Sequence, residues 1–212
     1  MRRPFRNPEK LTGNICVYAA AGREKPPYKQ AAFRTGELIG EHGYNLVYGG
    51  IDVGLMRQVA SGARSTGARV TGVIPGAGDD LVGSDMFLGE EPLRRDIITT
   101  PNLITRKHTM LQMSDAVIAL AGGIGTFDEI ATTLELSRGR VRHGAVSRFV
   151  ILNTDGFYDG LRTQLERMED EGLLRAHVED CVTFAETPEQ AVGYIHSQLA
   201  DIPRITPPES KE

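Results

Sequence analysis

Short apolar runs of strand length alternate with helix-like segments along most of this chain, and this alternation constrains the fold more than any other feature. Most of the runs are continuously apolar, which is typical of strands covered on both faces of a parallel sheet. The expected strands are residues 14–20, 44–50, 68–75, 97–100, 115–123, 147–153 and 181–186. The expected helices are residues 28–43, 54–67, 102–114, 126–138, 158–172 and 188–200. The sequence therefore predicts an α/β fold, a Rossmann-like doubly wound and mostly parallel sheet with helices on both faces.

The chain of 212 residues has a suitable length for one such domain. We expect residues 14–200 to form a single domain, because no boundary or internal repeat interrupts the alternation. Residues 1–13 are expected to form an N-terminal tail, and the proline-rich residues 201–212 a C-terminal tail. Residues 76–96 are glycine-rich and acidic, and we expect them to form a long functional loop.

Composition excludes several classes of function. The net charge of −4 argues against a nucleic-acid partner, and no window approaches the roughly 18 apolar residues of a membrane span. The N-terminal arginines are followed by no apolar stretch, so no secretory signal is expected. Two cysteines cannot form a structural zinc site by themselves, and the five histidines show no metal-ligand spacing. We therefore expect a cytoplasmic protein that binds no nucleic acid, no membrane and no metal.

Glycine-rich turns follow three of the expected strands, and "LAGGIGTFDEI" at residues 120–130 is the most specific of them. Ligands of doubly wound sheets bind at the carboxyl ends of the strands. Glycines at 122, 123 and 125 let the backbone approach an oxygen-rich group, and the free N–H groups of the next helix attract anions. The turn lacks the lysine of a P-loop, and the first strand lacks the dinucleotide fingerprint. A purely structural turn is the alternative.

The helix after this turn carries a carboxylate, Glu129, whose environment the pattern leaves open. A step of about 100° per residue predicts a core-facing stripe of Phe127, Ile130, Ala131 and Leu134. Glu129 then points away from the core. It is either a solvated acid that favours the helix dipole or a group enclosed by a second subunit.

The expected helix of residues 102–114 carries two adjacent basic residues, Arg106 and Lys107. Leu103, Met110 and Met113 are expected to mark its buried side. Adjacent basic residues on a helix are usually solvated, whereas arginine is also the residue that best binds phosphate or clamps a carboxylate. The residue pattern alone leaves both interpretations open.

Two of these segments together resemble a known family. "GGIGTFDE", with "TRKHTM" upstream, resembles the P-G-G-x-G-T-x-x-E and R-K-x-x-M signatures of the Lonely Guy (LOG) phosphoribohydrolases. "VYGG", "GLM", "VTGVIP" and "LNTDGFYDGL" stand in the expected order, so the resemblance covers roughly residues 14–200. It implies a Rossmann-like homodimer with shared active sites. Such enzymes hydrolyse the N-glycosidic bond of nucleoside 5′-monophosphates, notably cytokinin riboside monophosphates, to the free base and ribose 5-phosphate.

The resemblance also implies roles for individual residues. It assigns catalysis to Arg106 and Glu129, and substrate binding to the neighbouring Lys107. The residues implied to cradle the nucleotide are Gly122, Gly123, Ile124, Gly125, Thr126, Phe127 and Asp128. A substrate-contacting glutamate corresponds to Glu90 or Glu91, and a contacting threonine corresponds to Glu135. No cofactor is implied, and nothing in the sequence suggests a pyridoxal phosphate site.

The chain departs from the family pattern at several positions. The proline before the glycines is Ala121, and the first loop reads "AAAG" where the family has C-G-S-S, so hydroxyls are missing. The other departures are Ile51 and Arg57 at glycine positions, Glu135 at the threonine position and Leu136 at a tryptophan position. We expect these changes to affect which base is accepted. The alternatives are an AMP or pyrimidine nucleotide N-glycosidase of the same family and a non-catalytic nucleotide- or cofactor-binding carrier.

Overall fold

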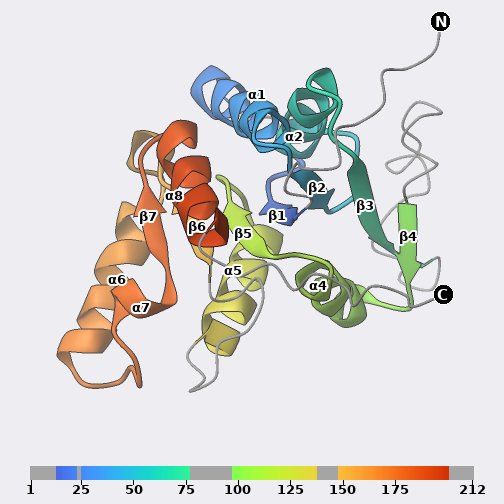
Figure 1. Ribbon diagram of the computed structural model, residues 1–212. Coiled ribbons are helices and arrows are strands. Elements are labelled where there is room, and N and C mark those ends of the chain that lie inside the picture. The colour runs from blue at the N-terminus through green and yellow to red at the C-terminus, as the bar shows by residue number, and fades with distance from the viewer. Residues whose placement is uncertain (1–12, 23–24, 77–96, 138–147, 201–212) are drawn as a thin grey trace, which may run out of the picture.

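The computed structural model describes residues 13–22, 25–76, 97–137 and 148–200 (Figure 1). Within these residues, seven strands form one parallel sheet in the order β4-β3-β2-β1-β5-β6-β7. The strands are β1 (Asn14–Tyr18), β2 (Asn45–Tyr48), β3 (Val70–Pro75), β4 (Ile97–Thr100), β5 (Ala116–Ala119), β6 (Phe149–Leu152) and β7 (Thr183–Ala185). The chain thus starts in the middle of the sheet and fills one half before the other.

Helices cover both faces of the sheet (Figure 1). One face carries α1 (Pro26–Glu41), α2 (Gly54–Ser65) and α8 (Pro188–Ala200). The other carries α4 (Leu103–Gln112), α5 (Ile124–Ser137), α6 (Asp159–Asp170) and α7 (Val178–Cys181). Along β1, Ile15 and Val17 point into the first core, and Cys16 and Tyr18 point into the second. This arrangement confirms the predicted Rossmann-like, doubly wound fold.

The loops after β1 and β5 diverge at the centre of the sheet. The two strands are neighbours, with Val17 opposite Ile118, but α1 and α5 lie on opposite faces. Doubly wound folds bind their ligands in the crevice that such a divergence leaves. The Ala20 N–H donates to the Ala121 carbonyl at 3.2 Å and joins the two loops at the base of this crevice.

The last expected strand is shorter than predicted and begins later. β7 covers Thr183–Ala185, and Cys181 ends the short helix α7 instead of opening a strand. Glu169 accepts the Val178 N–H at 3.0 Å, and acidic residues in the first turn of α7 favour a helix there. The 3₁₀ turn η3 (Thr154–Gly156) was not predicted.

The expected loop after residue 76 and both expected tails, apart from residue 13, lie outside the described residues, so the predicted domain boundaries stay predictions. None of the helices in the described ranges is long and apolar enough to cross a bilayer. The described part of the chain also contains no group of three or more side chains suited to a metal ion. The cytoplasmic location stays a prediction.

Candidate active site

A cavity of about 420 Å³ occupies the crevice between the loops after β1 and β5. One side is apolar and comes from the loops after β1 and β2, from the end of β3 and from the first turns of α2 and α4. Its residues are Ala19, Ala20, Ala21, Gly22, Gly49, Ile51, Met56, Pro75 and Leu103. The other side comes from α4 and α5 and is mostly polar. Its residues are Arg106, Lys107, Gly123, Gly125, Thr126, Asp128 and Glu129. The cavity therefore suits a ligand with one apolar part and one polar or anionic part.

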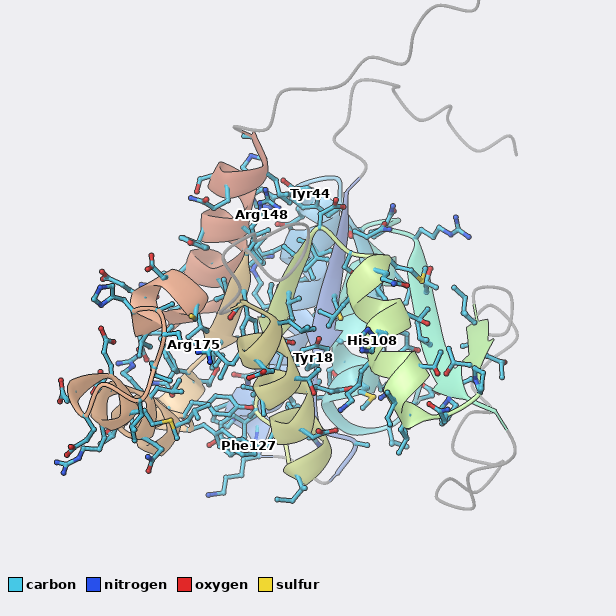
Figure 2. All side chains as sticks on the ribbon, turned by 90° about the horizontal axis from the view of Figure 1, so that it is seen from below. Tyr18, Tyr44, His108, Phe127, Arg148 and Arg175 are labelled. Carbon is cyan, nitrogen blue, oxygen red and sulfur yellow. The ribbon has the colours of Figure 1, made fainter. Side chains whose placement is uncertain are left out.

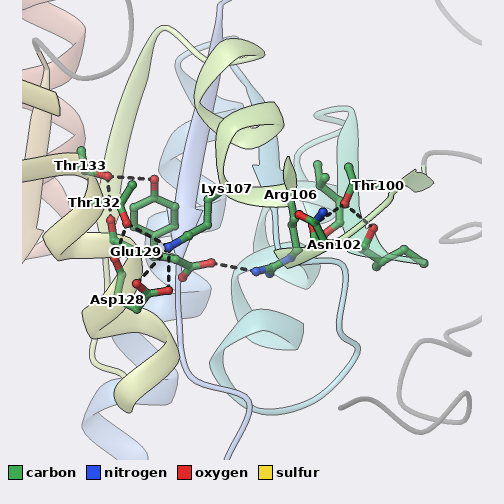
Figure 3. A network of polar contacts seen from close by, with 11 residues as sticks. Thr100, Asn102, Arg106, Lys107, Asp128, Glu129, Thr132 and Thr133 are labelled. Carbon is green, nitrogen blue, oxygen red and sulfur yellow. Dashed lines mark hydrogen bonds and ion pairs between the residues drawn. The ribbon is translucent and has the colours of Figure 1, made fainter. Parts of the chain in front are cut away.

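Arg106 reaches this cavity from α4, and hydrogen bonds fix its guanidinium. The side chain of Asn102 accepts the Thr105 N–H at 2.9 Å and caps the start of the helix. Arg106 Nε donates to the carbonyl of Val73 at 2.8 Å, and Nη1 donates to Oε1 of Glu129 at 3.0 Å (Figure 3). Only a tenth of the arginine side chain is exposed. The guanidinium therefore has one defined orientation.

Glu129 is buried beside this guanidinium. Burial raises the pKa of Glu129, and the Arg106 charge and hydrogen bond oppose that rise. Oε1 carries the arginine bond, so Oε2 is left for a group in the cavity. In its ionised form, a carboxylate held in this way is oriented and sparsely hydrated, which suits it to stabilise a positive charge or to accept a proton.

The core-facing stripe predicted for α5 is only partly confirmed. Ile130 is buried and Leu134 packs against the second core, but the expectation that Glu129 points away from the core is wrong. The buried residues of α5 are Thr126, Glu129, Ile130, Thr133 and Ser137. Phe127 is 48% exposed and Ala131 is also exposed. The helix is turned because polar partners lie inside. Arg106 binds Glu129, and the buried Tyr18 hydroxyl lies 3.0 Å from Thr133 Oγ1. Leu103 is likewise 39% exposed, although it was expected on the buried side of α4.

Lys107 and Asp128 form a second ion pair at the mouth of the cavity (Figure 3). Lys107 Nζ donates to the two oxygens of Asp128 at 3.0 and 2.8 Å and to Thr132 Oγ1 at 3.0 Å. Asp128 is largely exposed, whereas the lysine side chain is mostly covered. This pair ties α4 to α5 and gives Asp128 a structural partner that the sequence pattern did not reveal.

The glycine turn presents backbone donors to the cavity that have no partner among the described residues. The first bond of the α5 helix runs from the Phe127 N–H to the Gly123 carbonyl at 2.9 Å, so the N–H groups of residues 124–126 have no helical acceptor. Gly122 must be glycine, because a Cβ there would come within 2.1 Å of Thr126 Oγ1. Together with the helix dipole, these N–H groups form an anion site beside Glu129.

The start of α2 is not available in the same way. Two of its first three N–H groups, those of Leu55 and Met56, donate to the Ala20 carbonyl, at 3.0 and 3.3 Å. Of the glycine-rich turns that follow β2 and β5, only the one before α5 therefore keeps all three of its helix-start donors free within the described residues.

Gly49 lets the Arg106 guanidinium lie against the backbone after β2. A Cβ at this position would come within 2.2 Å of Nη2 and within 3.0 Å of the Met56 sulfur. Gly49→Ala is expected to push the guanidinium away from Glu129 and so to raise the pKa of that carboxyl further. Titration followed by carboxyl-carbon NMR measures the shift. Gly193→Ala is the control, because a Cβ there meets open space. An unchanged Glu129 titration in Gly49→Ala would contradict this role.

The remaining predicted residues are spread over several places. Glu90 and Glu91 lie outside the described residues. Ile124 and Phe127 lie at the exposed start of α5 and do not line the crevice cavity, and Figure 2 shows Phe127 at that end of the helix. Glu135 lines a second cavity, of about 400 Å³, between α5 and α6.

Among the departures from the family pattern, Ile51 lines the crevice cavity. Arg57 instead pairs with Asp52, with Nε 3.2 Å from Oδ1. Leu136 is 41% exposed and lies outside both cavities. The departures in residues 19–22 and at Ile51 therefore share the crevice cavity, whereas those at Arg57, Glu135 and Leu136 lie outside it.

No role was predicted for Tyr158, whose buried hydroxyl donates to the Leu120 carbonyl at 2.8 Å. The apolar side of the cavity, including Met56 and Pro75, was not predicted either. Their position near the ends of expected strands was the one sequence signal for a role in the site. That they meet at the same cavity depends on the order of the strands in the sheet.

A family model described as "possible lysine decarboxylase" matches residues 56–195. A cytokinin riboside 5′-monophosphate phosphoribohydrolase of Arabidopsis thaliana is 32% identical, over 87% of this chain and 83% of that protein. A probable enzyme of the same name from Oryza sativa subsp. japonica is also 32% identical, over 82% of this chain and 67% of that protein.

Solved structures with the same fold include a molybdenum cofactor carrier protein from Chlamydomonas reinhardtii. It is 22% identical with a TM-score of 0.65, over 90% of this chain and 100% of that one. A molybdenum cofactor binding protein from the phototrophic bacterium Rippkaea orientalis is 24% identical with a TM-score of 0.62. The match covers 89% of this chain and 98% of that one.

Proposed function

The chain belongs to the LOG family, whose model is described as "possible lysine decarboxylase", and from this premise we propose that it is a phosphoribohydrolase. It would cleave the N-glycosidic bond of a nucleoside 5′-monophosphate to give the free base and ribose 5-phosphate. One observation carries the proposal. A buried, arginine-bound carboxylate stands one helical turn beyond a set of free backbone N–H groups in the same cavity.

The chemistry follows from this juxtaposition. The phosphate binds the N–H groups at the start of α5, which brings the ribose over the first helical turn. As the glycosidic bond breaks, its electron pair leaves with the base, and positive charge develops on the ribose beside Glu129. Water attacks C1′ and gives a proton to Glu129, the departing base takes up a proton from solvent, and Glu129 then returns its proton to solvent. Arg106 holds the carboxylate in place throughout.

The base, in this proposal, lies against the apolar side of the cavity formed by Ile51, Met56 and Leu103. The names of the relatives support a cytokinin-type purine nucleotide as substrate, and an apolar wall suits an apolar substituent on the base. AMP and pyrimidine nucleotides are the alternatives within the same reaction. Because the loop after β1 offers only alanine and glycine to the cavity at positions 19–22, phosphate binding depends on α5.

The test is direct. The protein is incubated with AMP, isopentenyladenosine monophosphate, CMP and other 5′-monophosphates, and ribose 5-phosphate is assayed, with a Glu129→Gln variant as background. Release above that background identifies an N-glycosidase, and the ratio of kcat/KM values between nucleotides identifies the preferred base. If none of the nucleotides releases ribose 5-phosphate above that background, the proposal is refuted.

A carrier function is the second candidate. The solved neighbours named as carrier or binding proteins for the molybdenum cofactor share the fold, and the loop after β1 lacks hydroxyls. A carrier needs the anion site before α5 but has no use for a carboxylate paired with arginine inside the cavity. Tight nucleotide binding without any release of ribose 5-phosphate in the same assay would favour this candidate.

Amino-acid decarboxylation, which the family description suggests, is less well supported. A carbonyl cofactor for that reaction attaches to a free lysine amine. Lys107 is the lysine among the cavity residues described, and its ammonium is bound to Asp128 and Thr132. An amine engaged in this way is a poor nucleophile.

The proposal includes a homodimer, which exposed apolar side chains on α4 and α5 support. These side chains are Leu103, Ile104, Ile124 and Phe127, near the starts of the two helices, and Ile124 is 85% exposed. Ile124→Asp is expected to convert the dimer into a monomer, because a charge would be buried at the interface. Light scattering at micromolar concentration measures the mass. Leu173→Asp is the matched control on an exposed leucine outside α4 and α5 and should stay dimeric. A monomeric wild type would contradict the homodimer.

A further inference from the structure

The connection between β6 and α6 reaches the glycine turn that follows β5. Tyr158 stands immediately before α6, and its hydroxyl donates to the Leu120 carbonyl at 2.8 Å. Both residues are buried. Leu120 directly follows β5 and begins the turn into α5. A side chain 38 positions away in sequence therefore binds the backbone at the point where the turn begins.

Tyr158 is itself held firmly. Its N–H donates to Oδ1 of the buried Asn153 at 2.7 Å, and Asn153 Nδ2 donates to Asp159 at 2.8 Å. Asp155 within this connection has a φ of 55°, a left-handed conformation that is strained for a residue with a Cβ. The Phe157 ring meets the tyrosine ring edge-on, with centroids 4.8 Å apart. The surrounding contacts keep the hydroxyl directed at Leu120 in spite of the strain.

The turn needs such external contacts, because its glycines alone allow many backbone conformations. The Ala20 N–H holds the next carbonyl, that of Ala121, at 3.2 Å. Thr126 packs directly against Gly122 at the far end of the turn. Tyr158 thus holds the first residue of a segment whose other parts are held by β1 and by α5 itself.

We propose that Tyr158 is a positioning residue, whose hydroxyl holds the Leu120 carbonyl so that the N–H groups at the start of α5 point into the cavity before a ligand binds. Tyr158 does not line the cavity and acts only through the turn. The identity of the ligand, a nucleotide phosphate, rests on the proposed function. Preorganised donors bind an anion without first being ordered, so phosphate affinity depends on this hydroxyl.

Tyr158→Phe removes the hydroxyl and keeps the ring. Tyr44→Phe is the matched control, because its hydroxyl binds His196 at 2.9 Å and the residue lies at the opposite end of the sheet from Phe127 (Figure 2). Hydrogen exchange is measured at the Leu120 and Phe127 amides, which donate to carbonyls at 2.9 Å. We expect about tenfold faster exchange in Tyr158→Phe and no change in Tyr44→Phe. Equal exchange in both variants would overturn the inference.

Kinetics give the second readout. The KM for the best nucleotide is expected to rise about tenfold in Tyr158→Phe with kcat within about twofold, because the turn binds the ground state and the transition state alike. A merely structural role would lower the Tm of both variants and leave both KM values unchanged, which would also overturn the inference. If the wild type hydrolyses no nucleotide, the proposed function fails, and the exchange rates still decide whether Tyr158 holds the turn.

Discussion

Replacing Glu129 with glutamine is expected to lower kcat for nucleotide hydrolysis about 10³-fold, with KM changed only slightly. Glutamine keeps the size of the side chain, and its carbonyl oxygen can accept the bond from Arg106 that Oε1 accepts now at 3.0 Å. What is lost is the negative charge beside the developing ribose cation and the acceptor for the proton of water. Single-turnover release of ribose 5-phosphate measures the effect.

The control for this variant is Glu166→Gln, which neutralises an exposed carboxylate on α6, outside the crevice cavity. It should match the wild type within about twofold. Retention of more than about a tenth of kcat in Glu129→Gln would exclude the carboxylate as the principal catalytic group, even if the protein does hydrolyse nucleotides.

Replacing Arg106 with glutamine is expected to lower kcat/KM about 10²-fold or more and to move the acid limb of the pH profile to higher pH. The reaction needs Glu129 ionised. Burial raises the pKa of this carboxyl, and the Arg106 charge is the largest influence that lowers it. Without the arginine the pKa rises further, so the carboxylate is protonated over a wider acid range. The dependence of kcat/KM on pH measures the shift.

The free energy of unfolding is expected to depend on pH through the same raised pKa of Glu129. In the Arg106 variant the folded-state pKa of Glu129 lies above the unfolded-state pKa, so the folded protein binds more protons between the two values. The free energy of unfolding therefore falls as pH rises through that window. Arg167→Gln, at an exposed position on α6, is the control for both measurements. An acid limb that stays in place or moves to lower pH would contradict the assigned role of Arg106.

Much of the fold follows from local pattern. The apolar runs at residues 14–20 and 115–123 predicted β1 and β5, because buried parallel strands leave no polar alternation. The orientation of α5 could not be predicted in this way. A helical wheel weighs only hydrophobicity, which favoured Phe127 for the core. It contains no information about the guanidinium that approaches from α4 or the hydroxyl that approaches from β1.

For the candidate site, too, the sequence indicated some residues but not the contacts between them. Arg106 and Glu129 were named from a resemblance in short motifs, but their hydrogen bond depends on how α4 and α5 pack. The pairing of Lys107 with Asp128 and the contact of Tyr158 with Leu120 depend on three-dimensional arrangement, so no spacing rule reveals them. The role of Glu90 stays a prediction.

The order of the strands also has a consequence for synthesis. β1 to β4 leave the ribosome first and can pair in sequence, but one edge of β1 stays open until β5 arrives about 100 residues later. That edge belongs to a strand with both faces apolar, which is prone to pair with other chains while exposed. The cavity has no anion site until α5 has been synthesised. A bound substrate therefore cannot protect the half of the sheet that β1 to β4 form from pairing with other chains. Its protection must come from rapid closure of the sheet or from a chaperone.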